Sequence, residues 1–157
     1  EIGSYTRAYV GGDNRTYTET PSISAPGYMN LLTGAWTNKH NVYDNDVKSP
    51  RYHYKNIFRL CNKNYPDKKI AIFSIWTANR IKLIGEGLAT ASNITFHNKF
   101  DGYELDQIIY PHDPYSHYIF DIDECVTNKT SKCIKIYEPD LSWVYLIQYT
   151  DNESITE

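Results

Sequence analysis

The chain has 157 residues (18.3 kDa), a length typical of one domain. Hydrophobic residues make up 41% of it and charged residues 22%, so the chain can bury a core and is not a disordered tail. The net charge of −3 argues against a protein that binds nucleic-acid duplexes, because such proteins carry a basic surplus. No apolar stretch approaches the length of about 20 residues that a membrane-spanning helix needs.

The first half of the chain predicts two short helices and one buried strand. Residues 26–32 are expected to form a helix, because Pro26 suits a first helical turn and Gly34 is a stop signal. Apolar residues at helical spacing predict a second helix over residues 50–61. Residues 70–76 form a nearly continuous apolar run, which is typical of a strand buried on both faces of a parallel sheet.

The second half continues this alternation of helices and strands. A helix capped by Thr77, a short strand over 93–96, a helix over 103–110 and a loop over 111–118 are expected. Residues 141–148 form a second apolar run and are predicted to be another central strand. The pattern therefore predicts an α/β domain with a mostly parallel sheet flanked by helices. Because the last strand lies close to residue 157, residues 1–157 are interpreted as a single, partial domain.

Four Asn-x-Ser/Thr sequons indicate the secretory pathway, where N-glycans are attached. The acceptor residues are Asn14, Asn93, Asn128 and Asn152. The chain is therefore predicted to be secreted, extracellular and glycosylated.

The three cysteines agree with a secreted protein. Cys125 and Cys133 are eight residues apart and flank a polar segment that contains a sequon, as in a disulfide that closes a small surface loop. We expect these two residues to form a disulfide. Cys61 remains, either as a buried thiol or as the partner of a cysteine in another chain.

The most informative segment of the sequence covers residues 18–45. Ser24 is followed by an alanine and a proline, a Thr-Gly pair begins nine residues later at Thr33, and His40 and Asn45 follow. Taken alone, this pattern also describes a capped helix that ends in a Thr-Gly stop. Its combined spacings resemble the nucleophile region of the alkaline phosphatase superfamily, most closely the nucleotide pyrophosphatase/phosphodiesterase branch.

The resemblance implies an alkaline-phosphatase-like fold and hydrolysis of phosphodiesters, nucleotides or pyrophosphates, with Ser24 as the nucleophile. A serine hydroxyl needs activation, and the N-terminus of a helix would favour both an alkoxide and a bound phosphate. In the family, two zinc ions complete the site and one of them holds the nucleophile. Asn45 would donate an amide N–H to a phosphoryl oxygen as charge develops.

The metal ligands of the family are only partly matched. Asp151 follows the predicted strand 141–148 where the family has a metal-binding Asp, so the resemblance implies Ser24 and Asp151 as zinc ligands. Four residues later the family has His, whereas this chain has Ile155, which cannot bind zinc. The family's upstream Asp and its downstream Asp-His pair and final His are absent from the chain.

An alternative function follows from this incomplete zinc set. The chain would then be a catalytically inactive, glycosylated extracellular structural or assembly protein that keeps the fold. Its 15 tyrosines, which join a large apolar ring to a polar tip, suit contacts with other protein chains or self-assembly.

Overall fold

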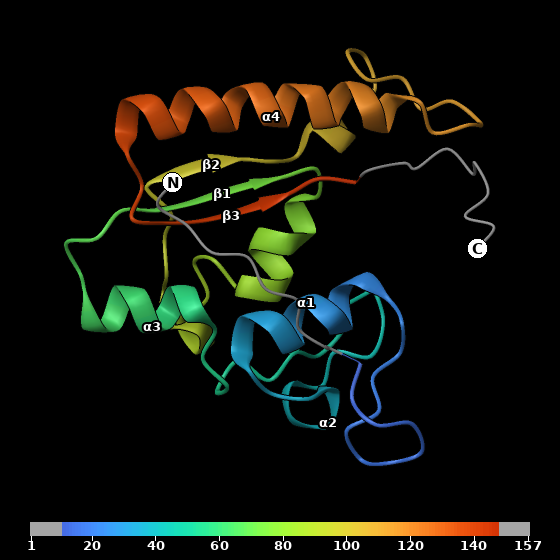
Figure 1. Cartoon of the computed structure of the whole chain (residues 1–157), viewed down its shortest axis with the longest axis vertical. Coiled ribbons are helices and arrows are strands. Elements are labelled where there is room, and N and C mark those ends of the chain that lie inside the picture. The colour runs from blue at the N-terminus through green and yellow to red at the C-terminus, as the bar shows by residue number, and fades with distance from the viewer. Residues whose placement is uncertain (1–10, 148–157) are drawn as a thin grey trace, which may run out of the picture.

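The computed structural model describes residues 11–147, which form three parallel strands between layers of helices (Figure 1). Strand β1 (Ile70–Ser74) lies at the centre, with β2 (Asn98–Phe100) on one side and β3 (Leu141–Tyr145) on the other. Both neighbours run parallel to β1. The expected α/β class, with a parallel sheet flanked by helices, is therefore confirmed.

The longest helix covers one face of the sheet, and most of the shorter helical elements lie on the other side (Figure 1). The long helix is α4 (Tyr118–Tyr137). The shorter elements are α1 (Ser24–Thr33), α2 (Thr37–His40), α3 (Ile57–Asn64), the π-helix η1 (Asn79–Ile84), and the 3-10 turns η2 (Ala89–Ala91) and η3 (Tyr103–Leu105). Among residues 11–147, no helix combines the length and apolar character needed to cross a membrane.

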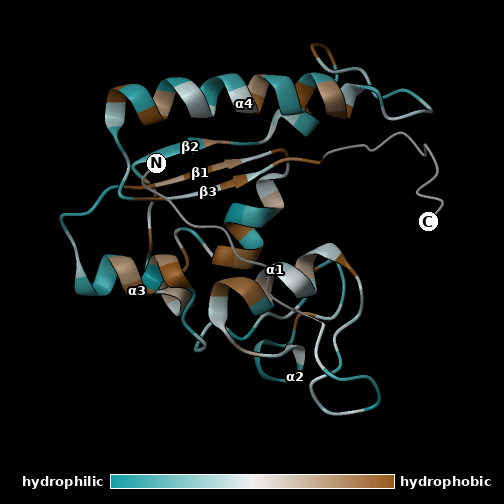
Figure 2. Cartoon of the chain, viewed as in Figure 1, coloured by the Kyte–Doolittle hydropathy of each residue, from teal (hydrophilic) through white to brown (hydrophobic). Residues whose placement is uncertain are grey.

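Strand β1 is buried on both faces, as its apolar run predicts. Ala71 and Phe73 pack toward the apolar side of α4, in a cluster with Ile119, Ile122 and Val126. Ile70 and Ile72 point to the opposite face, where they pack with Phe58, Ile84, Ile94 and Phe96. Figure 2 shows this apolar strand at the centre of the sheet, between the two helical layers.

A third apolar cluster positions helix α1. Its Ala25 and Met29 are buried against Val42, Val47 and Leu83. The helix ends where the sequence predicts, because Gly34 adopts a φ of 64°, which glycine tolerates without strain, and its N–H donates to the Asn30 carbonyl.

Other predicted elements are shifted or shortened. Helix α3 begins only at Ile57, after Asn56, whose side chain accepts a hydrogen bond from the Arg59 N–H at 3.0 Å. The short strand lies at 98–100 and not at 93–96, and the expected helix over 103–110 is reduced to the turn η3. In the described sheet, β3 is an edge strand and not a central one, and its side chains alternate between half-buried and exposed.

The predicted disulfide between Cys125 and Cys133 is wrong, because both residues lie in helix α4 and both thiols are free. Eight residues of α-helix rise by about 12 Å. The Cα atoms of a disulfide are at most about 7 Å apart, so the bond cannot form across this stretch of helix. The Cys133 thiol belongs to the apolar cluster under α4, and burial raises its pKa.

Candidate functional site

A pocket of about 390 Å³ opens at the carboxyl end of the parallel sheet. In open α/β sheets, ligands bind at this edge, beyond the carboxyl ends of the strands. The walls combine the first turn of α1, the loop around residue 45, the start of η1 and the segments after β1 and β3. The lining residues are Ser24, Ala25, Tyr28, Asn45, Val47, Trp76, Ala78, Asn79, Leu83, Glu104, Tyr145 and Ile147.

Ser24 and Asn45, which the sequence predicts to act together, both line this pocket. Ser24 is the first residue of α1 and is exposed. The Ala25 N–H donates to Asn45 Oδ1 at 3.0 Å, so the asparagine satisfies one of the unpaired N–H groups of the helix terminus. Since a backbone N–H can only donate, this contact fixes the amide orientation and leaves Asn45 Nδ2 as a donor.

This contact also changes one expectation about helix α1. The Ala25 N–H is already bonded to Asn45 and Pro26 has no N–H, so neither residue can donate to an anion at the helix terminus. Ser24 supplies the remaining N–H among the first three residues of the helix.

His40 shapes the loop that carries Asn45. Its ring is fully buried, with Nε2 2.7 Å from Asn30 Oδ1 and Nδ1 accepting from the Val42 N–H at 3.1 Å. Because Nδ1 accepts, the ring is the neutral tautomer protonated on Nε2. Burial lowers the pKa of His40 from 6.5 to about 4, which favours this neutral form. His40 is therefore a structural residue of the 18–45 segment.

Glu104 is a pocket residue that the sequence analysis did not identify. The turn η3 carries its side chain back to β1, where Oε1 accepts from the Thr77 N–H at 2.9 Å. Oε2 is buried and has no hydrogen-bond partner. Burial raises the pKa of Glu104, although the backbone N–H groups of Thr77 and of Glu104 itself act in the opposite direction. Nothing in the sequence distinguishes Glu104 from other acidic residues in polar loops, so it could not be identified as a buried pocket residue.

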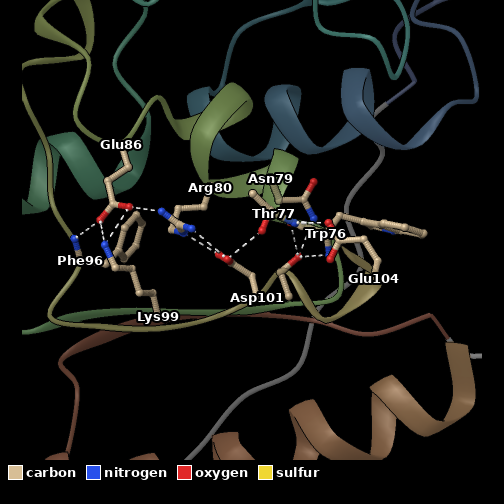
Figure 3. A network of polar contacts seen from close by, with 10 residues as sticks. Trp76, Thr77, Asn79, Arg80, Glu86, Phe96, Lys99, Asp101 and Glu104 are labelled. Atoms are coloured by element: carbon tan, nitrogen blue, oxygen red, sulfur yellow. Dashed lines mark hydrogen bonds and ion pairs between the residues drawn. The ribbon is translucent and has the colours of Figure 1, made fainter. Parts of the chain in front are cut away.

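A network of charges lies directly beside Glu104 (Figure 3). Arg80 binds both oxygens of Asp101, at 2.6 and 2.9 Å, and also pairs with Glu86. Thr77 Oγ1 donates to Asp101 at 3.0 Å and so joins this network to the Glu104 contact. The Asp101 bond is the main reason why the pKa of Arg80 is raised.

The described residues do not fit the zinc site that the family resemblance implies. Within residues 11–147, no group of three or more His, Cys, Asp or Glu residues is placed to hold a metal ion. Among the described residues that line the pocket, Glu104 is the only carboxylate and none is a Lys or an Arg. Asp151 lies outside the described residues.

Three of the predicted glycan acceptors lie at exposed positions. Asn14 and Asn93 are exposed in loops, and Asn128 is exposed on α4. Asn152 lies outside the described residues.

The pocket thus combines an exposed hydroxyl, an oriented amide donor, three aromatic rings and one buried carboxyl group. Comparison of the chain with protein-family models, with curated proteins and with solved structures finds no match. The function is therefore inferred from the chemistry of the pocket and from the spacing of the 18–45 segment.

Proposed function

We propose that the chain has an alkaline-phosphatase-like fold and acts as a phosphodiesterase or pyrophosphatase-like hydrolase, with Ser24 as its nucleophile. One observation carries this proposal: the exposed Ser24 begins α1 in a pocket at the carboxyl edge of the parallel sheet, beside the oriented amide of Asn45. Ser24 and Asn45 are 21 residues apart in the sequence, which is the interval on which the resemblance to the family rests.

The proposed reaction has two steps. Ser24 Oγ loses its proton to solvent and attacks phosphorus, a bond forms between Oγ and phosphorus, and the bond to the leaving oxygen breaks. The leaving group departs with that electron pair and takes a proton from solvent. Water then attacks phospho-Ser24 and releases the phosphate product with the serine restored. Asn45 Nδ2 donates to a phosphoryl oxygen, where negative charge increases in each transition state.

The aromatic walls support a nucleotide or another phosphodiester with a ring as the small-molecule ligand. Tyr28, Trp76 and Tyr145 all line the pocket, and the rings of Tyr28 and Tyr145 are 5.0 Å apart. Aromatic side chains provide flat apolar surface on which a ring can stack.

Zinc is the cofactor that the resemblance implies, with Ser24 and Asp151 among its proposed ligands. When bound, it would supply the positive charge that is lacking among the described residues of the pocket. The residues described do not fit a two-zinc site, so the steps above are derived from Ser24 and Asn45 alone.

Turnover of bis(p-nitrophenyl) phosphate by the full chain, with and without added zinc, tests the proposal. We expect Ser24→Ala to reduce turnover by more than about a thousandfold, because the nucleophile is removed. Ser22→Ala is the matched control, since Ser22 is exposed in the same loop and does not line the pocket. Equal turnover by the two variants, or none by the wild type, would reject Ser24 as a nucleophile.

A catalytically inactive protein is the second candidate. The observation that favours it is that residues 11–147 contain no group of three potential metal ligands. In that case the native protein would contain no zinc and would show no turnover that depends on Ser24. Its proposed partners would be other protein chains or further copies of itself.

We also propose that the chain is secreted and carries N-glycans. The exposure of Asn14, Asn93 and Asn128 supports this, because an acceptor must reach the surface. Expression in cells with a secretory pathway, followed by digestion with a peptide N-glycosidase, tests it. A fall in mass after digestion would support glycosylation, and an unchanged mass would contradict it.

A further inference from the structure

The open oxygen of Glu104 is the strongest unexplained feature of the described residues. The residue is only 9% exposed, yet its Oε2 has no hydrogen-bond partner. Buried polar atoms in native proteins are nearly always paired, so an unpaired one calls for a specific explanation. Glu104 lines the same pocket as Ser24 and Asn45, and a ligand in that pocket would give Oε2 its missing partner.

The surroundings of Glu104 favour a neutral carboxyl group. Among the described residues that line the pocket, there is no Lys or Arg to balance a carboxylate. Arg80, the nearest cation of the network in Figure 3, is bound to Asp101 and Glu86. Oε1 accepts from the Thr77 N–H, so the proton of the neutral acid belongs on Oε2. The unpaired oxygen is then a hydrogen-bond donor.

We propose that Glu104 is a ligand-binding residue of the pocket, and that its protonated carboxyl group donates a hydrogen bond from Oε2 to a phosphoryl oxygen of a bound phosphodiester. The inference rests on the proposed function for the identity of the ligand. A phosphodiester anion offers acceptors and no donor at its phosphoryl oxygens, so it matches a carboxylic acid. An ionised Glu104 would repel the same ligand.

The groups around Glu104 influence the pKa of its carboxyl group. Asp101 raises the pKa of Glu104 by charge repulsion, in addition to the effect of burial. The ring of His112 contacts the Glu104 backbone carbonyl at 3.1 Å, and Tyr28 and Tyr145 line the same pocket as Glu104. Tyr145 is neutral near pH 7, since burial raises its pKa above the ordinary value of 10.0.

Binding of diethyl phosphate, measured by calorimetry or NMR titration in metal-free buffer, tests the proposal. This diester keeps one negative charge across the acid and neutral range, so a change in affinity reports on the protein. We expect the affinity of the wild type to fall at least about tenfold between about pH 5 and pH 8, because the donor is lost as Glu104 ionises.

The variant Glu104→Gln tests whether the Glu104 carboxyl group, and not another titrating group, causes the pH dependence of the affinity. The glutamine keeps an oxygen for the Thr77 N–H and a permanent donor in place of Oε2, so we expect its affinity to be independent of pH. Glu124→Gln, at an exposed position on α4, is the matched control and should keep the wild-type profile. A flat profile for the wild type, no binding by the wild type, or an unchanged profile in Glu104→Gln would each overturn the proposal. The Ser24 turnover assay decides the proposed function separately.

Discussion

The side chains of Glu86 and Glu104 are both buried and lie on opposite sides of the Arg80–Asp101 pair (Figure 3), but they differ in their hydrogen-bond partners. The Glu86 side chain is 6% exposed, and its oxygens accept from the Phe96 N–H at 2.9 Å, from Lys99 at 3.2 Å and from Arg80. At Glu104, Oε1 accepts from the Thr77 N–H at 2.9 Å, whereas Oε2 has no hydrogen-bond partner.

This difference in partners reverses the effect of burial on the pKa. Burial by itself raises the pKa of a carboxyl group. At Glu86 the Phe96 N–H, Arg80 and Lys99 outweigh burial and lower the pKa, whereas at Glu104 burial prevails and raises it. A buried acid with all its partners thus acts as a structural ion, and one with an open oxygen in a pocket is a candidate ligand-binding group.

The largest effect should follow from removal of the cation that balances the structural network. Arg80→Met would leave Asp101 and Glu86 buried without their main partner. We expect a loss of about 3 kcal/mol in the free energy of unfolding, measured by urea denaturation. Arg51→Met is the control, because Arg51 is exposed. Equal losses in the two variants would show that the network contributes no more than a surface arginine.

His40 tests whether a buried side chain with partners for both of its polar atoms is also kept in its neutral form. The folded-state pKa of His40 is lowered to about 4, so the unfolded chain takes up a proton first as the pH falls below 6.5. His40 therefore contributes stability above pH 6.5, and this contribution, about 3 kcal/mol, is lost as the pH falls towards 4.

The variant His40→Gln should remove that part of the acid sensitivity. We expect its free energy of unfolding to fall less steeply than that of the wild type between about pH 6.5 and pH 4. His53→Gln, at an exposed position, should keep the wild-type slope. If His40→Gln also keeps that slope, the ring takes up a proton without cost and the buried network does not hold it neutral.

Local spacing accounts for what the sequence predicts correctly. The helix after Ser24 depends on short-range signals, a proline and a Thr-Gly stop. Ser24 and Asn45 line one pocket, and their catalytic roles stay predictions. Strand β1 is also correctly predicted, because a strand buried on both faces needs no polar alternation.

Helix α4 was not predicted, although its apolar residues recur at helical spacing. Ile119, Ile122, Val126 and Cys133 all face the sheet. A sequon and a pair of cysteines in the same segment are typical of a surface loop, whereas the apolar spacing is typical of a helix. The segment forms a helix because its apolar residues pack against Ala71 and Phe73 of β1.

Glu104 could not be found from sequence because its role depends on long-range contacts. Its partner Thr77 is 27 residues away, and its burial arises where η3 folds back onto the end of β1. The same holds for the Arg80 network, which joins residues from η1 and from the segments around β2.

The comparison of the two glutamates can be tested by making the same substitution at both. Glu86→Gln removes two ion pairs and should lower the free energy of unfolding near pH 7 by about 2 kcal/mol. Glu104→Gln removes an acid that is costly to ionise in the folded state, so it should raise the free energy of unfolding by about 1 kcal/mol at the same pH.

The pH dependence of the change in unfolding free energy shows, for each variant, whether the folded-state pKa of the glutamate is raised or lowered. The stability that Glu86 contributes is present above its ordinary value of 4.5 and is lost as the pH falls through its lowered folded-state pKa. The penalty at Glu104 is present above its raised folded-state pKa and disappears as the pH falls towards 4.5. The two variants should therefore differ most near neutral pH and converge in acid, as measured by urea denaturation across that range. Destabilisation of equal size by both substitutions would mean that Glu104 is a structural ion like Glu86, and its open oxygen would then need no ligand.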